Sequence, residues 1–205
     1  MKVSDGTILG TYTVGTTPFG ICFDGTNIWV SNRDSNTITK LKASDGSILG
    51  TYTVKGLSAV SGVCFDGTNI WVASSSQVTK LKASDGSILG TYAMGNANLG
   101  VCFDGTNIWV TNADSSQVTK IKASDDSILG TYTVGTEPQS ICFDGTNIWV
   151  GNWGSNNVIE LRASDGTLLG TYAVGYEPVG ICSDGTNIWV VNYESNSVTK
   201  LSITK

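Results

Sequence analysis

Short apolar runs recur along the whole chain, and small polar residues separate them. In the first complete unit the runs span residues 19–23, 27–32, 37–42 and 47–54, and we call them A, B, C and D. Gly, Asp, Asn and Ser stand between the runs, and no stretch shows a sustained helical period. The pattern predicts an all-β chain made of short strands.

The segments between these runs carry hairpin signals. Runs A and B are joined by Asp24-Gly25-Thr26, and runs C and D by Ser44-Asp45-Gly46. Asp-Gly favours tight turns because Gly accepts a positive φ and Asp can bond nearby amides. One unit has Asp125-Asp126 instead. Since Asp tolerates the left-handed region, we expect a local cost of about 1 kcal/mol or less there and no new site.

The unit recurs five times. The tetrapeptide LGTY begins every 40 residues, and the heptapeptide DGTNIWV begins at Asp24, Asp66, Asp104, Asp144 and Asp184. Four antiparallel strands per period of about 40 residues predict the blade of a β-propeller, with five blades in all. Blades pack on both faces, which explains why IWV is continuously apolar. We therefore expect one tryptophan per unit between blades: Trp29, Trp71, Trp109, Trp149 and Trp189. The alternative is five tryptophan platforms for ligands.

The two ends of the sequence complement each other. Residues 7–14 form a D run with no A, B or C before it, and residues 179–202 supply A, B and C with no D after them. This predicts a single domain over 1–205, closed when 1–14 becomes the outer strand of the last blade, whose inner three strands are 179–202. A segment of a larger ring and an assembly by strand exchange between chains are the alternatives.

Composition narrows the classes of partner. Charged residues make up only 14% of the chain, the net charge is −5, and the Lys and Arg residues form no basic block. We therefore expect no nucleic-acid partner and no anionic membrane partner. No apolar run approaches the roughly 20 residues of a membrane span, and no signal peptide follows Met1. These features predict a soluble monomer and leave its location undefined.

Candidate chemistry is sparse. The five cysteines, one per unit, are interpreted as small buried hydrophobes and not as a disulfide framework. The sequence has no histidine, no Cys-x-x-Cys, no nucleophile elbow, no phosphate-binding Gly loop and no calcium motif. We therefore predict no cofactor, no metal site and no catalytic residue. Only a carboxylate pair such as Glu177 and Glu194 offers acid–base chemistry. The prediction is a non-catalytic repeat scaffold or binding module.

Differences among the five units concentrate in the B–C and D–A connections, including the D–A segment from Lys55 to Ser61. In an antiparallel blade these connections lie at the same end, so we expect one variable face that carries any ligand site. Unusual aromatic residues and nearby carboxylates fall in consecutive blades of a closed ring, and this pairing suits a sugar or a cationic group. The expected partner of this face is a small molecule, a carbohydrate or a protein. Neutral drift is the alternative. The predicted ligand-binding residues are Phe19, Trp153, Tyr176, Tyr193, Glu177 and Glu194.

A second candidate on that face is the asparagine that ends run B. It recurs in four units, and Ser74 replaces it in the remaining one. A ring of amides at the channel could bind a ligand, water or an ion, whereas the structural alternative is a hydrogen bond that caps the loop. The residues are Asn32, Asn112, Asn152 and Asn192.

The pattern VGxxPxGIC, DGTNIWVxN and SNxVTKL resembles the NHL and YVTN type of propeller repeat and is similar to the repeats of streptogramin lyase. The resemblance covers all five units and implies the propeller fold. A streptogramin lyase-like activity implies a catalytic histidine, which this chain lacks. Gluconolactonase-like propellers hold a divalent metal with Glu, Asn and Asp near the channel, so the alternative function is a metal-dependent hydrolase or lyase. The near-identity of the units suggests recent duplication or deliberate construction from one parent repeat.

Overall fold

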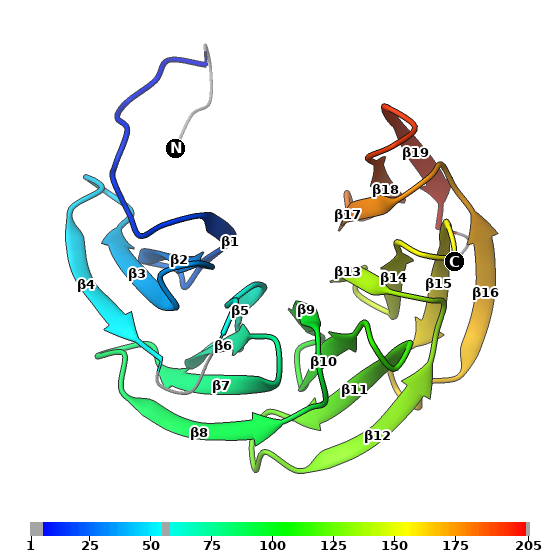
Figure 1. Ribbon diagram of the computed structural model, residues 1–205, viewed down its shortest axis with the longest axis horizontal. Coiled ribbons are helices and arrows are strands. Elements are labelled where there is room, and N and C mark those ends of the chain that lie inside the picture. The colour runs from blue at the N-terminus through cyan, green and yellow to red at the C-terminus, as the bar shows by residue number, and fades with distance from the viewer. Residues whose placement is uncertain (1–5, 55–57, 204–205) are drawn as a thin grey trace.

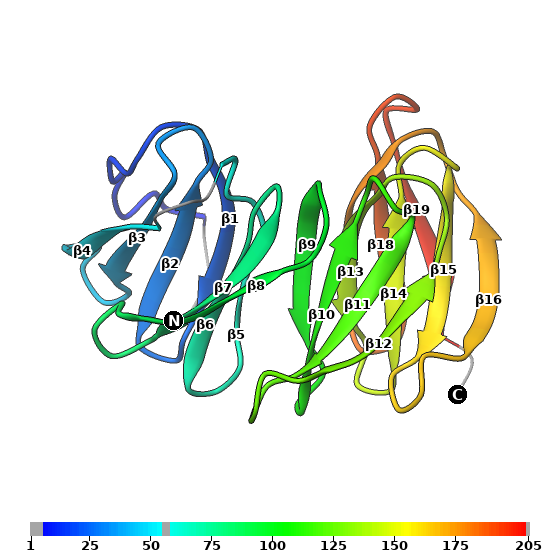
Figure 2. The ribbon, with the colours of Figure 1, turned by 60° about the horizontal axis from the view of Figure 1, so that its bottom comes forward.

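The computed structural model describes residues 6–54 and 58–203, and these residues form nineteen strands in five antiparallel sheets with no helix (Figure 1). The first strand of each sheet lies toward the centre of the arc and the last lies at its periphery. The predicted five blades and the all-β class are confirmed. The strands run across the thickness of the disc (Figure 2).

The strand bounds follow the repeat. Blade one contains β1 (Pro18–Phe23), β2 (Asn27–Asn32), β3 (Thr37–Lys42) and β4 (Ile48–Thr53). Blade two contains β5 (Val63–Phe65), β6 (Asn69–Ala73), β7 (Gln77–Lys82) and β8 (Ile88–Ala93). Blade three contains β9 (Asn98–Phe103), β10 (Asn107–Asn112), β11 (Gln117–Lys122) and β12 (Ile128–Thr133). Blade four contains β13 (Pro138–Phe143), β14 (Asn147–Asn152), β15 (Asn157–Arg162) and β16 (Leu168–Ala173). Blade five contains β17 (Pro178–Ser183), β18 (Asn187–Asn192) and β19 (Ser197–Ser202).

The DGTNIWV heptapeptide is a turn and a strand held together by its aspartate. In blade one the Asp24 carboxylate accepts hydrogen bonds from the backbone N–H of Thr26 at 2.9 Å and of Asn27 at 2.6 Å. It also accepts one from the Trp29 indole Nε1 at 2.7 Å. Gly25 takes the positive φ of 92° that this turn requires. The heptapeptide therefore recurs because every blade needs it.

The tryptophans pack between blades, as predicted, at the four blade boundaries that form. Trp29 is fully buried in one cluster with Val63, Ile70 and Leu81 of blade two. It also stacks on Tyr52, with ring centroids 5.7 Å apart. The same tryptophan–tyrosine contact recurs in blades two, three and four. Burial of apolar area on both faces of a blade is thus the main stabilising term of the arc.

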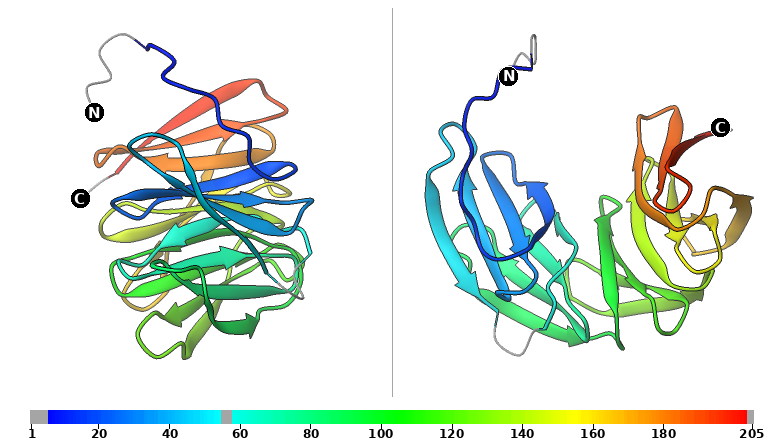
Figure 3. Two further views of the ribbon diagram at one scale, coloured as in Figure 1. Left: turned by 90° about the vertical axis from the view of Figure 1, so that its left-hand side faces the viewer. Right: turned by 45° about the horizontal axis from the view of Figure 1, so that its top comes forward.

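The predicted closure does not form in this structure. Blade five is a three-stranded sheet, and residues 6–14 are not a strand; they run beside blade one, on the other side of an opening in the ring (Figures 1 and 3). The five blades form an open arc, and residues 6–14 and β19 lie on opposite sides of its opening (Figure 1). Residues 6–14 are therefore too far from β19 to pair with its free edge.

The opening leaves apolar side chains uncovered at both ends. On blade five, Trp189 is 37% exposed and Val198 is 59% exposed, whereas the four other tryptophans of the heptapeptide are at most 2% exposed. On the opposite side, Ile8 and Leu9 are 83% and 78% exposed. In the described part of the chain no helix is long and apolar enough to cross a membrane.

Candidate functional site

The D–A and B–C connections of each blade interlock at one end of the strands. In blade one, the backbone N–H of Arg33 donates to the carbonyl of Thr17 at 2.9 Å, and the N–H of Thr16 donates to Ser35 Oγ at 3.1 Å. The corresponding N–H to carbonyl bond joins Trp153 to Glu137 and Tyr193 to Glu177, both at 2.9 Å. The variable segments therefore share one face, as the antiparallel topology predicts. We call it the loop face; of its segment Lys55 to Ser61, residues 55–57 lie outside the described residues.

A strained backbone position recurs on the loop face. One residue in the D–A connection of each blade has a φ between 52° and 56° although it is never glycine. It directly precedes the first strand in blades one, three, four and five, and in blade two it lies four residues before β5. This conformation aims the residue's carbonyl, or that of its neighbour, at the B–C loop of the same blade. Because all five blades share it, the strain belongs to the architecture of the loops. The positions are Thr17, Ala59, Ala97, Glu137 and Glu177.

Blade five presents two tyrosines of the predicted set together. Tyr176 and Tyr193 are 65% and 66% exposed, and they stand on the two interlocked connections of that blade. The backbone N–H of Tyr176 donates to Ser195 Oγ at 2.6 Å, and that of Tyr193 donates to the Glu177 carbonyl at 2.9 Å. Glu194 is exposed next to Tyr193. Two exposed rings and a carboxylate thus occupy a small, hydrogen-bonded platform.

Trp153 comes from the neighbouring blade and is half-buried. Its B–C loop is tied to blade five, because Asn156 Oδ1 accepts the backbone N–H of Glu177 at 2.8 Å. The B–C loop that carries Trp153 is therefore linked through Asn156 to the D–A connection that carries Glu177. That Trp153 belongs to the same ligand site as the two tyrosines stays a prediction.

Phe19 does not join that group. It lies on blade one, across the opening from Tyr193, and the Arg33 guanidinium sits 5.3 Å from its ring centroid. The prediction assumed a closed ring in which blades five and one are neighbours. Because the ring is open, Phe19 is 53% exposed at the other end of the arc, and its only described aromatic-type contact is with a cation of its own blade.

The predicted ring of asparagine amides is wrong for this structure. All four side chains are buried, with exposures of 2% or less, so they line no channel. Asn32 Nδ2 donates to Thr39 Oγ1 at 3.0 Å, and Asn192 Nδ2 donates to Thr199 Oγ1 at 2.9 Å. Asn152 Nδ2 donates to Asn157 Oδ1 at 2.8 Å, and Asn112 Nδ2 donates to the Met94 carbonyl at 2.6 Å. They tie the B–C loops to the blades, which is the structural alternative.

Sequence reasoning missed a cavity elsewhere on the loop face. A hollow of about 350 Å³ lies between the loops of blades one, two and three. It carries a cation and an anion, Arg33 and Asp114, which only the packing of separate blades brings together. Because Arg33 and Asp114 lie far apart in the sequence, no local motif indicated this cavity. The remaining lining residues are Ala59, Ser75, Asn96, Ala97 and Leu99.

Four of the five cysteines are only partly buried and pack against the clusters between blades, whereas the sequence predicted five buried ones. Burial, with a smaller effect of the Asp24 charge, raises the pKa of the Cys22 thiol to about 12. Burial also raises the pKa of Cys142 to about 12 and places those of Cys64 and Cys102 well above the ordinary value. Cys182, at the opening, is exposed. Within the described residues, no three His, Cys, Asp or Glu side chains gather in a way that could hold a metal ion.

Comparison with known proteins gives a fold and no family. No family profile and no curated protein sequence matches the chain. A virginiamycin B lyase from Staphylococcus aureus superposes with a TM-score of 0.81 at 21% identity, over 98% of this chain and 72% of the lyase. A streptogramin B lyase gives 0.72 at 20% identity, over 95% and 72%. A protein of unknown function from Desulfotomaculum acetoxidans gives 0.77 at 16% identity, over 94% and 71%.

These likenesses confirm the resemblance to streptogramin lyase-like propellers at the level of the fold. They contradict the prediction that the protein is not an enzyme, because two of the similar structures are named as lyases. The prediction rested on the absence of histidine and of known catalytic motifs. Because one fold can carry many different activities, these absences do not exclude an enzyme. At about 20% identity the comparison transfers the architecture and no individual residue.

Proposed function

We propose that the protein is a propeller-type binding module whose ligand contacts the loop face at Tyr176 and Tyr193. The observation that carries the proposal is the pair of exposed rings on two hydrogen-bonded connections. Exposed aromatic rings that are held in place lose little conformational entropy on binding. No other pair of neighbouring connections in the described loops exposes two aromatic rings in this way.

The chemistry of the platform favours a saccharide or an organic cation. A tyrosine ring offers an apolar face and a hydroxyl, and the adjacent carboxylates of Glu177 and Glu194 accept hydrogen bonds or attract positive charge. Each ring stacked on a cation contributes on the order of 1 kcal/mol at an exposed site. Two rings therefore supply about half of the roughly 4 kcal/mol that a millimolar dissociation constant requires, and hydrogen bonds or ion pairs with the carboxylates have to supply the rest.

The test is saturation-transfer NMR of the full chain with a panel of neutral oligosaccharides and with choline. We expect a signal that Tyr176→Ala and Tyr193→Ala each lower severalfold. Thr146→Ala is the matched control, since Thr146 is exposed in a turn on the opposite face. Binding that survives both tyrosine substitutions would contradict this site and would direct attention to the cavity of Arg33 and Asp114.

Lyase activity on a streptogramin-type compound is the second candidate function, and the named structural neighbours are the observation that favours it. Because the sequence contains no histidine, a proton acceptor in this chain would have to be of another type, and Glu177 and Glu194 are the carboxylates of the aromatic platform. Incubation with virginiamycin B, followed by chromatography and mass spectrometry, tests it. Conversion that Glu177→Gln or Glu194→Gln abolishes would support the assignment, and an unchanged compound would end it.

A further inference from the structure

The two ends of the arc expose matching halves of the contact that joins neighbouring blades. Where the contact is formed, a lysine of the third strand lies over the tryptophan of its own blade, 5.0 Å from the ring centroid, in Lys40 and Lys120 alike. The amine then crosses to the next blade. Lys40 Nζ donates to the Ala83 carbonyl at 2.7 Å, and Lys120 Nζ donates to the Ala163 carbonyl at 2.7 Å.

Blade five has the lysine and the tryptophan of this contact, but no further blade follows it to supply the accepting carbonyls. Lys200 lies 5.0 Å from the ring centroid of Trp189, as in the formed contacts. No carbonyl among the described residues receives its amine. Val191 and Val198 surround the pair and are 46% and 59% exposed. The face is therefore an intact blade–blade surface without a partner.

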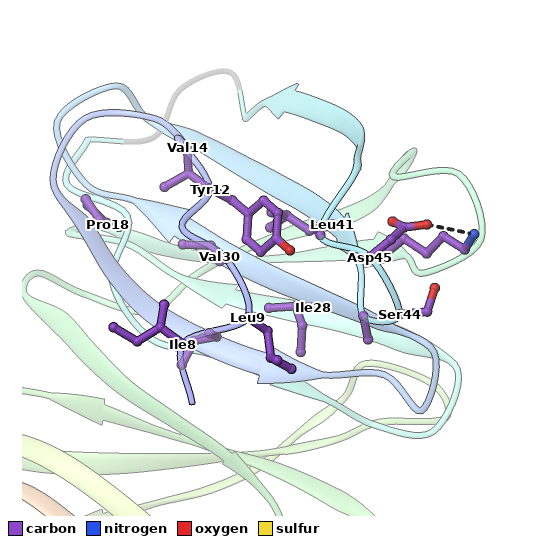
Figure 4. Close-up of a pocket in the computed structure, with 15 residues that line it drawn as sticks. Ile8, Leu9, Tyr12, Val14, Pro18, Ile28, Val30, Leu41, Ser44 and Asp45 are labelled. Atoms are coloured by element: carbon purple, nitrogen blue, oxygen red, sulfur yellow. Dashed lines mark hydrogen bonds and ion pairs between the residues drawn. The ribbon is translucent and has the colours of Figure 1, made fainter. Parts of the chain in front are cut away.

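Blade one carries the acceptor half. A cavity of about 500 Å³ lies between residues 8–14 and the face of blade one, and Ile28, Val30 and Leu41 point toward it (Figure 4). Ala43 and Ser44 border the same cavity. They occupy the turn position whose carbonyls receive the lysine in blades two and four.

Residues 8–14 already hold the place of a fourth strand against blade one. Tyr12 packs over Gly46 so closely that a Cβ on this glycine would overlap the ring. Tyr52 packs on Gly86 and Tyr132 packs on Gly166 in the same way across formed boundaries. The segment is thus positioned as the outer strand of a blade, yet the described residues place no inner strands beside it.

The size of the opening follows from the structural neighbours. Five blades cover 98% of this chain and 72% of the virginiamycin B lyase, so the lyase has the length of about seven such blades. The strands needed to fill the opening also follow from the unpaired segments on its two sides. The free edge of β19 needs a D strand, and residues 6–14 need A, B and C strands. Between them, two repeats in the order D-A-B-C fit the opening.

We propose that the opening is a binding site for a separate polypeptide of two repeats of this same type. Such an occupant gives Lys200 its carbonyls and covers the cavity of blade one without changing any formed boundary. Closure of the five blades on themselves would instead require a different angle at all four boundaries. A second whole copy brings five blades, three more than the opening holds.

The experiment mixes the full chain with a fluorescently labelled polypeptide made of two tandem copies of residues 83–122, which supply D, A, B and C in that order. We expect a 1:1 complex in analytical ultracentrifugation and a saturable rise in fluorescence anisotropy. Lys200→Ala should weaken binding about tenfold. Lys82→Ala, an exposed lysine paired with Asp85, is the matched control and should leave binding unchanged.

Three results would overturn the proposal: a compact monomer that binds no two-repeat polypeptide, self-association of the full chain, or equal binding by the Lys200→Ala variant. Two chains extended after Lys205 keep the test decisive if the separate polypeptide does not fold. The extensions are one or two copies of residues 86–125. The two-repeat extension should give the higher melting temperature and should bury Trp189, and a one-repeat extension of equal stability would contradict the proposed size. Failure here does not bear on the loop-face platform, because oligosaccharide or choline binding at Tyr176 and Tyr193 is measured separately.

Discussion

One carboxylate organises each A–B turn, and its ionisation is part of the fold. Asp104 accepts hydrogen bonds from the indole of Trp109 at 2.8 Å and from the backbone N–H of Asn107 at 2.6 Å. Burial by itself would raise the pKa of this carboxyl, but these hydrogen bonds outweigh it and the pKa lies below its usual value. The charged form is therefore the one that the folded chain prefers.

The C–D turns add four further acids of the same kind. Hydrogen bonds from the Ser47 hydroxyl and backbone lower the pKa of Asp45 to about 2, and Asp85 repeats this with Ser87. The pKa of Asp125 falls to about 2, chiefly through Lys122, and that of Asp165 falls to about 2 through Thr167.

The pH dependence of stability follows from these acids. Their folded-state pKa lies below the unfolded value of about 3.9, so their contribution is complete above about pH 4 and is lost as the pH falls toward 2. With no histidine in the sequence, we expect a flat melting temperature from pH 7 to pH 5 and a decline from pH 4 to pH 2. Calorimetry at unit steps of pH tests this. A decline that begins near pH 6, or none by pH 2, would refute it.

The inter-blade lysines give a prediction at a single residue. Lys80 Nζ donates to the Ala123 carbonyl at 2.9 Å and to Asp126 Oδ1 at 2.7 Å, and its side chain is only 9% exposed. Lys80→Met leaves both acceptors without the amine, so we expect a loss of about 2 kcal/mol in the free energy of unfolding. Urea denaturation measures it. In the control Lys82→Met, which breaks an exposed pair with Asp85, the loss should stay below about 0.5 kcal/mol.

At the scale of the element, the sequence carries nearly all the information needed. The Asp-Gly turns and the apolar runs place the strands to within a residue or two, because each blade repeats the same local hydrogen bonds. Which side chains meet across a blade boundary could not be predicted. The bond from Lys40 to Ala83 spans two units and leaves no local pattern.

Blade three tests how a turn residue can serve a neighbouring blade. Asp126 takes the left-handed φ of 65°, as predicted for a residue that replaces the usual glycine. The sequence alone gave no reason to expect its two partners in blade two, Lys80 and the hydroxyl of Tyr92, which donates to Asp126 Oδ2 at 2.5 Å. The pKa of Tyr92 is raised by burial and by this bond.

For Asp126→Gly, two effects oppose each other. Relief of the left-handed backbone gains about 1 kcal/mol or less, whereas loss of the ion pair and of the Tyr92 bond costs about 2 kcal/mol. We therefore expect a net destabilisation of about 1 kcal/mol, seen as a lower urea midpoint. The reverse change, Gly86→Asp, should also destabilise, because Gly86 has a positive φ of 76° and the Tyr52 ring would have to move away from the new Cβ. A stabilised Asp126→Gly variant would show that backbone strain dominates.

At the scale of the whole molecule, sequence reasoning reached its limit. Complementary ends predict closure, but the angle between blades is set by packing at each boundary and cannot be read from a repeat. The candidate site depends on the same angle. Tyr176 and Tyr193 share one blade and are therefore neighbours in any ring, whereas Phe19 joins them only if blade one follows blade five directly.

The exposure of the Cys182 thiol, which lies at the opening of the ring, tests whether the ring is open in solution. Burial raises the pKa of Cys22 and Cys142 to about 12 and those of Cys64 and Cys102 well above the ordinary value, so these four should stay protonated at pH 8. Cys182 is exposed on blade five. With Ellman's reagent we expect one thiol per chain to react quickly in the native protein and all five after unfolding in guanidinium. Cys182→Ser should remove the fast phase and leave the other four unchanged. A native protein without a fast thiol would mean that blade five is covered in solution, and protection that follows only after the two-repeat polypeptide is added would identify what covers it.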